Sequence, residues 1–442
     1  MSLPRFSNYK DSGVEWLGEV PAHWEVISIK WISPVKRGAS PRPIDDPKYF
    51  DEDGEFAWVR IADVSSCDGL LTETTQRLSE LGSSLSVKMM PGDLFVSIAG
   101  TVGKPCISAI KACIHDGFVY FPTLQINPKF LYRVFEGGNC YGGLGKWGTQ
   151  LNLNTDTIGS IRIALPPPNE LSQVLEFLDR ETAKIDELVA EQRRLMNLLK
   201  EKRQAVISHA VTRGLNPDAP LKPSGIEWLG DVPAHWDVVP IKRIVSVPIT
   251  DGPHETPNFI EEGVPFVSAE AVSSGSINFS KVRACISEED NARYSLKYAP
   301  QLHDIYMVKS GATTGITAIV EGRTDFNIWS PLAAIRCNAN SVPHFVLNFM
   351  RSKHFQEAVT LFWSFGTQQN IGMGVIENLA CTVPPVNEQH AIAAILKTES
   401  EKFDTLTTEA QRAIDLLQER RTALISAAVT GQIDVRNLAT SA

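Results

Sequence analysis

The sequence lacks the features that would place this chain in a membrane, outside the cell or around a metal ion. Its seven cysteines are scattered, with no Cys-x-x-Cys pair and no metal-ligand spacing, which fits a reducing compartment and argues against zinc. We find no signal peptide and no apolar run of membrane length. We therefore expect a cytoplasmic protein with no metal site and no membrane partner.

Excess positive charge is also absent. The net charge is −9 and the isoelectric point is about 5.6, which argues against a chain that coats nucleic acid with its whole surface. Local basic loops that clamp a duplex stay compatible with this balance.

Catalytic motifs are missing as well. Gly100–Lys104 resembles a phosphate-binding loop only superficially, because Pro105 stands where a Ser or Thr is needed; a strand–turn–strand is the plainer interpretation. His23 and His235 each follow Pro-Ala and precede Trp, a placement that favours packing or a side chain–backbone bond over catalysis. We see no nucleophile, metal cluster or cofactor loop, and we predict a chain that is not an enzyme and carries no cofactor.

The chain does contain a long internal repeat. SGVEWLGEVPAHWEVISIKWI from Ser12 returns as SGIEWLGDVPAHWDVVPIKRI from Ser224, with 15 of 21 positions identical. Later segments echo each other in the same order: GDLFVSIAGTVGK with HDIYMVKSGATTG, GTQLNLN with GTQQNIG, and LPPPNE with VPPVNE. A chain built twice presents two similar surfaces, related by something close to a two-fold axis.

Each Pro-rich piece is followed by about 40 residues free of Gly and Pro, from Glu170 and from Glu388. Apolar residues there alternate in steps of three and four, which is the coiled-coil pattern. Two like helices in one chain most simply pair with each other and, under a two-fold axis, run antiparallel. The alternative is that each helix packs only on its own domain.

The globular parts are predicted to be mixed α/β (α+β), with more strand than helix. The runs FAWVRIADV, GDLFVSIAG, IRIALP, VPFVSAEAV and DIYMVKS have strand composition, and helices are expected near KFLYRVFEG and PHFVLNFMRSKHFQEAV. Residues 33–90 and 245–300 have little in common. A shared frame with divergent inserts is typical of one scaffold that carries two specificities.

In these segments, in this order and repeated twice, the chain resembles specificity subunits of type I restriction–modification systems. The resemblance implies two target-recognition domains held by an antiparallel pair of coiled-coil helices, with a pseudo-two-fold internal repeat. It also implies two modification subunits that use S-adenosylmethionine to methylate adenine N6, and two restriction/translocase subunits that use ATP with Mg. We expect these boundaries: recognition domain 1, residues 1–168; coiled-coil helix 1, 169–213; recognition domain 2, 214–386; coiled-coil helix 2, 387–432; C-terminal tail, 433–442.

The predicted function is recognition of a bipartite, asymmetric site in double-stranded DNA. Base edges are read mostly by Arg, Lys, Asn, Gln, Ser and Thr on loops. The candidate readers in the first domain are Lys36, Arg37, Arg42, Arg60, Thr101, Lys104, Lys146, Gln150 and Asn152. Those in the second domain are Thr250, His254, Arg283, Lys309, Thr313, Thr314, Gln368, Gln369 and Asn370.

Each candidate has a plainer interpretation. The two Thr-Gln segments could cap the next element, and single basic residues are often only solvated surface. Trp16, Trp24, Trp228 and Trp236 occur in both halves, so core or docking roles fit them better than base stacking. The alternative function for the whole chain is a coiled-coil interaction scaffold without DNA specificity.

Overall fold

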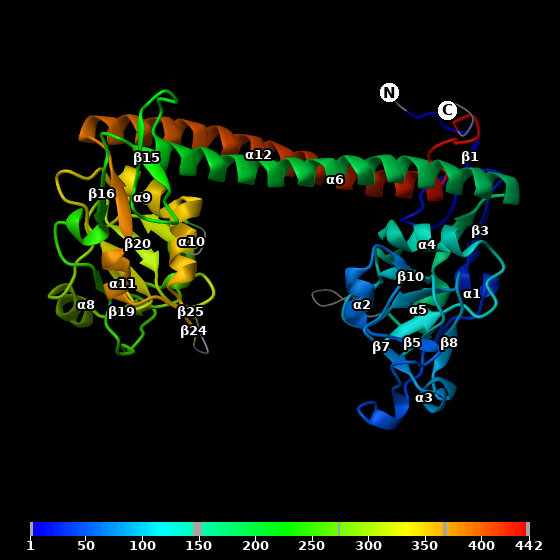
Figure 1. Cartoon of the computed structure of the whole chain (residues 1–442). Helices are drawn as coiled ribbons and strands as arrows, with labels where there is room; N and C mark the ends of the chain where they lie inside the picture. Colours follow the sequence, from blue (N-terminus) through cyan, green and yellow to red (C-terminus); the bar gives the residue numbers. More distant parts are fainter. Residues whose placement is uncertain (1–2, 145–152, 273–274, 366–368, 439–442) are drawn as a thin grey trace. The chain divides into compact units, whose positions relative to one another are not determined.

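A computed structural model describes residues 3–144, 153–272, 275–365 and 369–438. The chain divides into two compact units: unit 1 comprises residues 1–192 and 412–442, and unit 2 comprises residues 193–411. Each is mixed α/β, and each takes a part of both long helices (Figure 1).

The two long helices are α6 (Pro168–Arg213) and α12 (Val386–Val429). Proline precedes or opens each helix, where its missing N–H costs nothing. Gly214 and Gly431 follow them with φ of 77° and 70°, the left-handed conformation in which helices commonly end. Both helices therefore begin and end with matched residues.

The globular part of unit 1 is built from short elements. Its strands are β1 Tyr9–Asp11, β2 Glu19–Pro21, β3 Glu25–Ser28, β4 Lys36–Arg37, β5 Phe56–Val59, β6 Leu70–Leu71, β7 Gln76–Leu78, β8 Val87–Met89, β9 Leu94–Ser97, β10 Pro105–Ser108, β11 Ala112–Ile114, β12 Phe118–Tyr120 and β13 Arg162–Leu165. Its helices are α1 Ile29–Ile32, η1 Pro47–Tyr49, α2 Ile61–Ser66, α3 Glu80–Ser84, α4 Pro128–Glu136, η2 Asn139–Tyr141 and α5 Thr155–Ser160.

Unit 2 is built in the same manner. Its strands are β14 Leu221–Pro223, β15 Asp231–Pro233, β16 Asp237–Pro240, β17 Thr250–Asp251, β18 Val264–Val267, β19 Cys285–Ile286, β20 Ile305–Val308, β21 Thr317–Ile319, β22 Asn327–Ile328, β23 Leu332–Ile335, β24 Ser364–Phe365, β25 Gln369–Asn370 and β26 Ala380–Val383. Its helices are η3 Ile241–Arg243, α7 Ala269–Val272, η4 Phe279–Lys281, α8 Glu288–Ser295, α9 Pro343–Arg351, α10 Lys353–Leu361 and α11 Met373–Asn378.

The two units share their strand order. One sheet runs β4-β12-β9-β10 in unit 1 and β17-β23-β20-β21 in unit 2. The other runs β7-β5-β11 and β19-β18-β22, with β5–β11 and β18–β22 parallel. Among the described residues, unit 1 adds one edge strand to each sheet, β6 and β8. This order makes it possible to match positions whose sequences have diverged.

Two strand predictions were wrong in their second halves. FAWV forms β5 but IADV belongs to α2, because the Asp63 carboxylate accepts the Arg60 N–H at 2.9 Å and caps the helix. VPFV forms β18 and AEAV forms α7. The helical prediction for PHFVLNFMRSKHFQEAV is confirmed: the segment forms α9 and α10, and the Ser352 hydroxyl accepts the Phe355 N–H where α10 starts.

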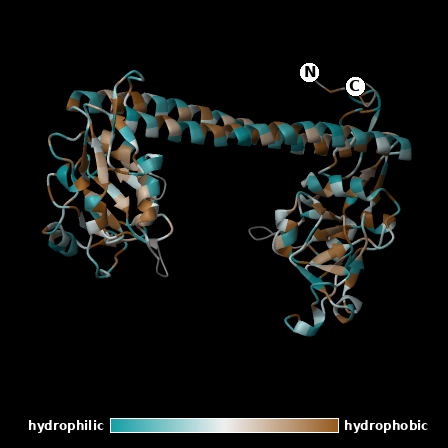
Figure 2. Ribbon diagram, viewed as in Figure 1, coloured by the Kyte–Doolittle hydropathy of each residue, from teal (hydrophilic) through white to brown (hydrophobic). Residues whose placement is uncertain are grey.

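The core of each unit includes both long helices. In unit 1, Phe130 and Phe135 of α4 pack with Leu178 of α6 and with Ile425 and Val429 of α12. In unit 2 the corresponding cluster joins α9 with Ile207 and Val211 of α6 and with Ile392 and Leu396 of α12. Apolar residues gather inside each globular part (Figure 2).

Within each unit the two helices run antiparallel. In unit 1, Asp186 of α6 pairs with Arg421 of α12 at 2.9 Å, and Glu170 lies 3.8 Å from Arg436, beyond the end of α12. In unit 2, Arg203 pairs with Asp404 at 2.5 Å.

Candidate nucleic-acid interface

The repeated EWLG…PAHW segment fixes each globular part to the long helices. The Trp24 indole N–H donates to Glu170 of α6 at 2.8 Å, and the Trp236 indole N–H donates to Glu388 of α12 at 3.1 Å. Both indoles are buried, at 1% and 0% exposure, which confirms a core role for these two residues.

Of the two alternatives expected for the two histidines, ring packing is confirmed, whereas their ring nitrogens contact a carboxylate and not the backbone. His23 lies 2.9 Å from Glu170, and His235 lies 2.8 Å from Glu388. The first turn of a helix favours a carboxylate, and this carboxylate attracts the neighbouring imidazole. Packing is also present, since the His23 ring contacts Phe6.

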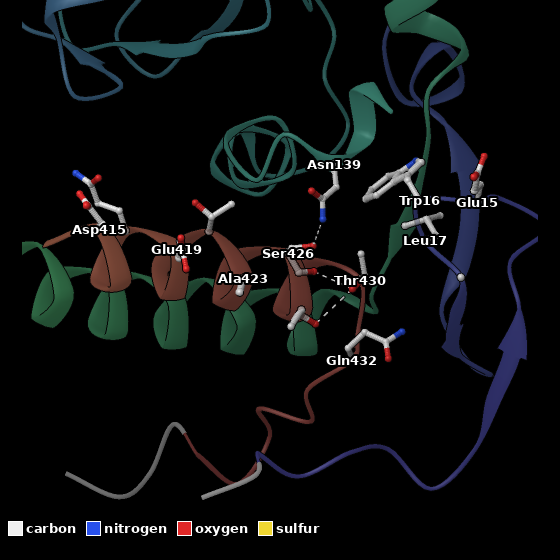
Figure 3. A pocket seen from close by; sticks show the side chains of 14 residues that line it. Glu15, Trp16, Leu17, Asn139, Asp415, Glu419, Ala423, Ser426, Thr430 and Gln432 are labelled. Carbon is white, nitrogen blue, oxygen red and sulfur yellow. Dashed lines mark hydrogen bonds between the residues drawn. The ribbon is translucent and has the colours of Figure 1, made fainter. Parts of the chain in front are cut away.

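A cavity of about 920 Å³ in unit 1 lies beside this repeated segment. Trp16 and Leu17 line one wall and the last turns of α12 line another; Asn139 donates to the Ser426 hydroxyl across the floor (Figure 3). None of the candidate readers that the structure describes lines this cavity. It belongs to the frame that both units share.

Two candidate readers of unit 1 line a second cavity of about 710 Å³, and a third, Arg37, contacts one of its lining residues. Arg42 and Arg60 line it together with His115 and Asp116. Arg42 donates to the Asp116 carboxylate at 3.2 Å and its side chain is 79% exposed. Arg37 of β4 donates to the Asp116 carbonyl. The guanidinium groups of Arg37 and Arg42 are therefore both bound to Asp116, and both side chains remain exposed to solvent.

His115 adds a neutral ring to this cavity. Its Nδ1 accepts the Gly117 N–H at 2.8 Å, so the proton of the neutral ring lies on Nε2. Burial lowers the pKa of His115 despite the neighbouring Asp116. The positive charge here is therefore carried by arginine.

The other candidates of unit 1 have different settings. Lys104 donates to the carbonyls of Ser65 and Cys67 at 3.0 and 2.8 Å, and the Thr101 hydroxyl bonds to that of Ser65. Both therefore tie the loop after β9 to α2. Lys36 is exposed on β4. Lys146, Gln150 and Asn152 lie outside the described residues.

In unit 2 three basic side chains surround one buried carboxylate. Asp251, 5% exposed, accepts from Lys297 at 2.7 Å and Lys309 at 2.8 Å, and His254 lies at 3.0 Å. Burial disfavours the ionised carboxyl, but the hydrogen bonds from the two lysines outweigh it and lower the pKa of Asp251. His254, 70% exposed, and Lys297, 52% exposed, reach solvent from this cluster.

The remaining candidates of unit 2 are spread over other loops. Thr250 precedes Asp251 on β17, and Arg283, 78% exposed, pairs with Glu270. Thr313 and Thr314 lie in the turn before β21; the Thr314 hydroxyl donates to the Gly311 carbonyl. Asn370 ends β25 and is exposed, Gln369 is described only in its backbone, and Gln368 lies outside the described residues.

Matched glycines show that the two basic clusters occupy equivalent places. Gly38 follows Arg37 and Gly252 follows Asp251. A Cβ on either glycine would meet a backbone carbonyl, that of His115 or that of Ile328. Arg37 and Asp251 also stand opposite equivalent strands, β12 and β23. Sequence reasoning missed Asp251, which an alignment of the two glycines would have placed opposite Arg37; it also missed Asp116 and Lys297, for which no sequence signal stands out.

The comparisons with known proteins agree with this architecture. A family model described as "Type I restriction modification DNA specificity domain" matches residues 233–415. The chain is 21% identical to the type I restriction enzyme MjaVIII specificity subunit of Methanocaldococcus jannaschii, over 95% of each protein. It is 22% identical to the EcoKI specificity subunit of Escherichia coli K12, over 94% of this chain and 90% of that one. The similarity to specificity subunits of type I restriction enzymes therefore extends over nearly the whole chain.

A solved structure has the same fold as this chain. A chain from a structure that describes the assembly and conformational transition of a type I restriction–modification system superimposes with a TM-score of 0.67. It is 17% identical and covers 93% of this chain and 98% of its own length.

Neither a cluster of metal-ligating side chains nor a membrane-spanning helix occurs among the residues that the structure describes. Nowhere in them do three or more His, Cys, Asp or Glu side chains gather as they would around a metal ion. Nor does any of their helices combine the length and apolarity that crossing a membrane requires.

Proposed function

We propose that this specificity subunit reads a bipartite, asymmetric site in double-stranded DNA, one half-site with each unit. The main support is the contrast between shared strand order and divergent edge residues. Arg37 in unit 1 and Asp251 in unit 2 hold equivalent positions, so the two edges present different donors and acceptors. Base pairs are distinguished by such donor and acceptor patterns.

In unit 1, the arginines around the 710 Å³ cavity are the residues proposed to contact DNA. In unit 2, the basic side chains around Asp251 are proposed to have this role. Arginine pairs bidentately with guanine in the major groove or with a phosphate oxygen. Arg42 is held by Asp116 while most of its side chain faces solvent, a setting that limits the entropy lost on binding.

The two long helices are proposed to pair along their length as an antiparallel coiled coil that relates the two recognition domains by a pseudo-two-fold axis. The domain boundaries expected from the sequence belong to the same proposal. The helix pair then sets the distance between readers, and hence the spacing of half-sites.

Partner subunits complete the proposed activity, in the cytoplasm. The relatives are named as subunits of type I restriction enzymes. We propose two modification subunits that methylate adenine N6 with S-adenosylmethionine, and two restriction subunits that use ATP with Mg. This chain itself contributes recognition and scaffolding, without catalysis.

A salt titration of DNA binding by the co-expressed subunit and modification complex tests recognition. Affinity for one duplex out of a random pool should exceed non-specific affinity by about 10³ or more and fall steeply with salt. Arg42→Ala should lower the salt slope by about 0.9 if the residue contacts phosphate, or relax one base position if it reads a base. Arg162→Ala, an exposed charge on β13, is the matched control. Equal affinity for all sequences would instead favour an interaction scaffold without DNA specificity.

A further inference from the structure

The two units differ most sharply in charge where α4 and α9 meet the long helices. Both short helices begin with proline, Pro128 and Pro343, and both span nine residues. Their ninth residues are Glu136 and Arg351. The fourth strand of the first sheet lies beneath each of them, β10 in unit 1 and β21 in unit 2. A carboxylate and a guanidinium therefore hold the same place in the two units.

In unit 1 this place is neutralised within the chain. Glu136, 15% exposed, pairs with Arg133 at 2.7 Å and with Arg421 of α12 at 3.0 Å. Arg421 also pairs with Asp186, and Arg133 with Asp179. Each guanidinium has more than one carboxylate.

In unit 2 the carboxylate is missing. Arg203 of α6 takes the place of Arg421 and pairs with Asp404. Arg351 makes no ion pair with any residue that the structure describes; its guanidinium donates to the carbonyls of Gly275 and Thr317. Burial lowers the pKa of Arg351, and the like charge of Arg203 adds to this effect. The two guanidinium groups thus repel each other where unit 1 has attraction.

A cavity of about 700 Å³ opens between these groups. Arg203 and Arg351 line it, together with Lys200, Thr317 and Asp404. The Thr317 hydroxyl is buried, and no hydrogen-bond partner for it exists among the described residues. Buried polar groups are almost always hydrogen-bonded, so this donor and the uncompensated guanidinium both point to an absent acceptor.

We propose that this cavity binds the phosphate groups of a small ligand, either inorganic phosphate or the phosphate chain of a nucleotide. Phosphate supplies the negative charge that Glu136 supplies in unit 1. Arginine pairs bind phosphate oxygens bidentately, and the volume falls in the range of ligand pockets. The proposal does not depend on DNA recognition, because no candidate reader among the described residues lines this cavity.

Calorimetric titration of the full chain with inorganic phosphate, and separately with ATP in the absence of Mg, tests the proposal. Ionic strength is held constant with chloride. Saturable binding of at least one of the two is expected, and the titration that saturates identifies the source of the phosphate. Arg351→Glu installs the arrangement of unit 1 and should weaken binding roughly ten- to hundredfold. Lys200→Gln, on the exposed face of α6, should weaken phosphate binding a few-fold. Because this exposed substitution should not disturb folding, it tests the proposal even if Arg351→Glu does not fold.

Arg421→Gln is the control, because it removes the equivalent charge from unit 1 and should leave phosphate binding unchanged. The proposal is overturned if neither phosphate nor ATP binds, if Arg351→Glu and Lys200→Gln both bind normally, or if Arg421→Gln loses binding equally. If a duplex without a specific site displaces phosphate, the cavity binds the phosphates of the DNA backbone and the proposal of a small ligand is overturned. If the free chain binds phosphate but the assembled complex does not, an acidic residue of a partner subunit occupies the cavity in the complex.

Discussion

Unit 1 and unit 2 have the same strand order but opposite charges at two matched positions. Arg37 corresponds to Asp251 at the edge of the first sheet, and Glu136 corresponds to Arg351 beside the long helices. Buried frame residues behave differently: Trp24 and Trp236 keep the same indole–carboxylate bond. Packing therefore constrains the buried residues that the two units share, whereas the residues at these two matched positions can differ while the strand order stays the same.

Exchange of one recognition segment should have the largest effect. Replacing residues 33–164 with the equivalent segment of a relative should change one half of the methylated motif completely and leave the other half unchanged. Each unit has its own core, so the second reader is not disturbed. Methylation mapping after the exchange checks this; a change in both halves would show that the units do not read independently.

The next largest effect is expected from the glycines that follow the edge strands β4 and β17. Gly38→Ala and Gly252→Ala should each destabilise their own unit by about 1–3 kcal/mol or more, because the new Cβ meets a carbonyl oxygen. Hydrogen exchange should accelerate in β4 and β12 for the first variant, and in β17 and β23 for the second. Gly322→Ala, where a Cβ meets nothing within 4 Å, should leave exchange unaltered.

Removing the carboxylate that accepts the buried indole N–H should destabilise the two units equally. Glu170→Ala and Glu388→Ala each remove the acceptor of a buried indole N–H, at a cost of about 1–3 kcal/mol. Hydrogen exchange at the start of α6 and of α12 measures it. A loss in one unit and none in the other would refute the equivalence of the two frames.

The smallest expected effect separates the two helix arginines. Arg421→Met breaks two partly exposed ion pairs and should destabilise unit 1 by about 1 kcal/mol after allowance for solvent screening. Arg203→Met removes one pair but also relieves repulsion with Arg351, so its cost should be close to zero in phosphate-free buffer. Chemical denaturation of both variants gives the ranking, and a larger loss for Arg203→Met would contradict the charge comparison.

The long helices could be predicted from the sequence because their heptad pattern persists over about 40 residues. The strands of residues 33–90 and 245–300 could not be matched, since most are only two to four residues long and show no periodicity. α2 and α7 were taken for strands because they are short and rich in apolar residues. Their capping depends on single contacts such as Arg60 with Asp63.

The site was predicted less completely than the fold. The sequence offers Arg37, Arg42 and Arg60 as separate basic residues, and only the fold brings Arg42 and Arg60 to one cavity and Arg37 to Asp116 beside them. The sequence did not reveal that Glu136 and Arg351 hold matched positions. The long helices align with an offset of 218 residues, whereas α4 and α9, which begin at Pro128 and Pro343, align with an offset of 215 residues. Loop lengths between repeats control this difference, and pattern alone does not reveal it.

The central claim is that one chain carries two readers of different sequence. Its most direct test is genome-wide mapping of adenine methylation in cells that co-express this subunit with its modification subunit. We expect a single motif with two different half-sites separated by a fixed run of unspecified bases. A continuous motif, or two identical half-sites in inverted orientation, would contradict the account.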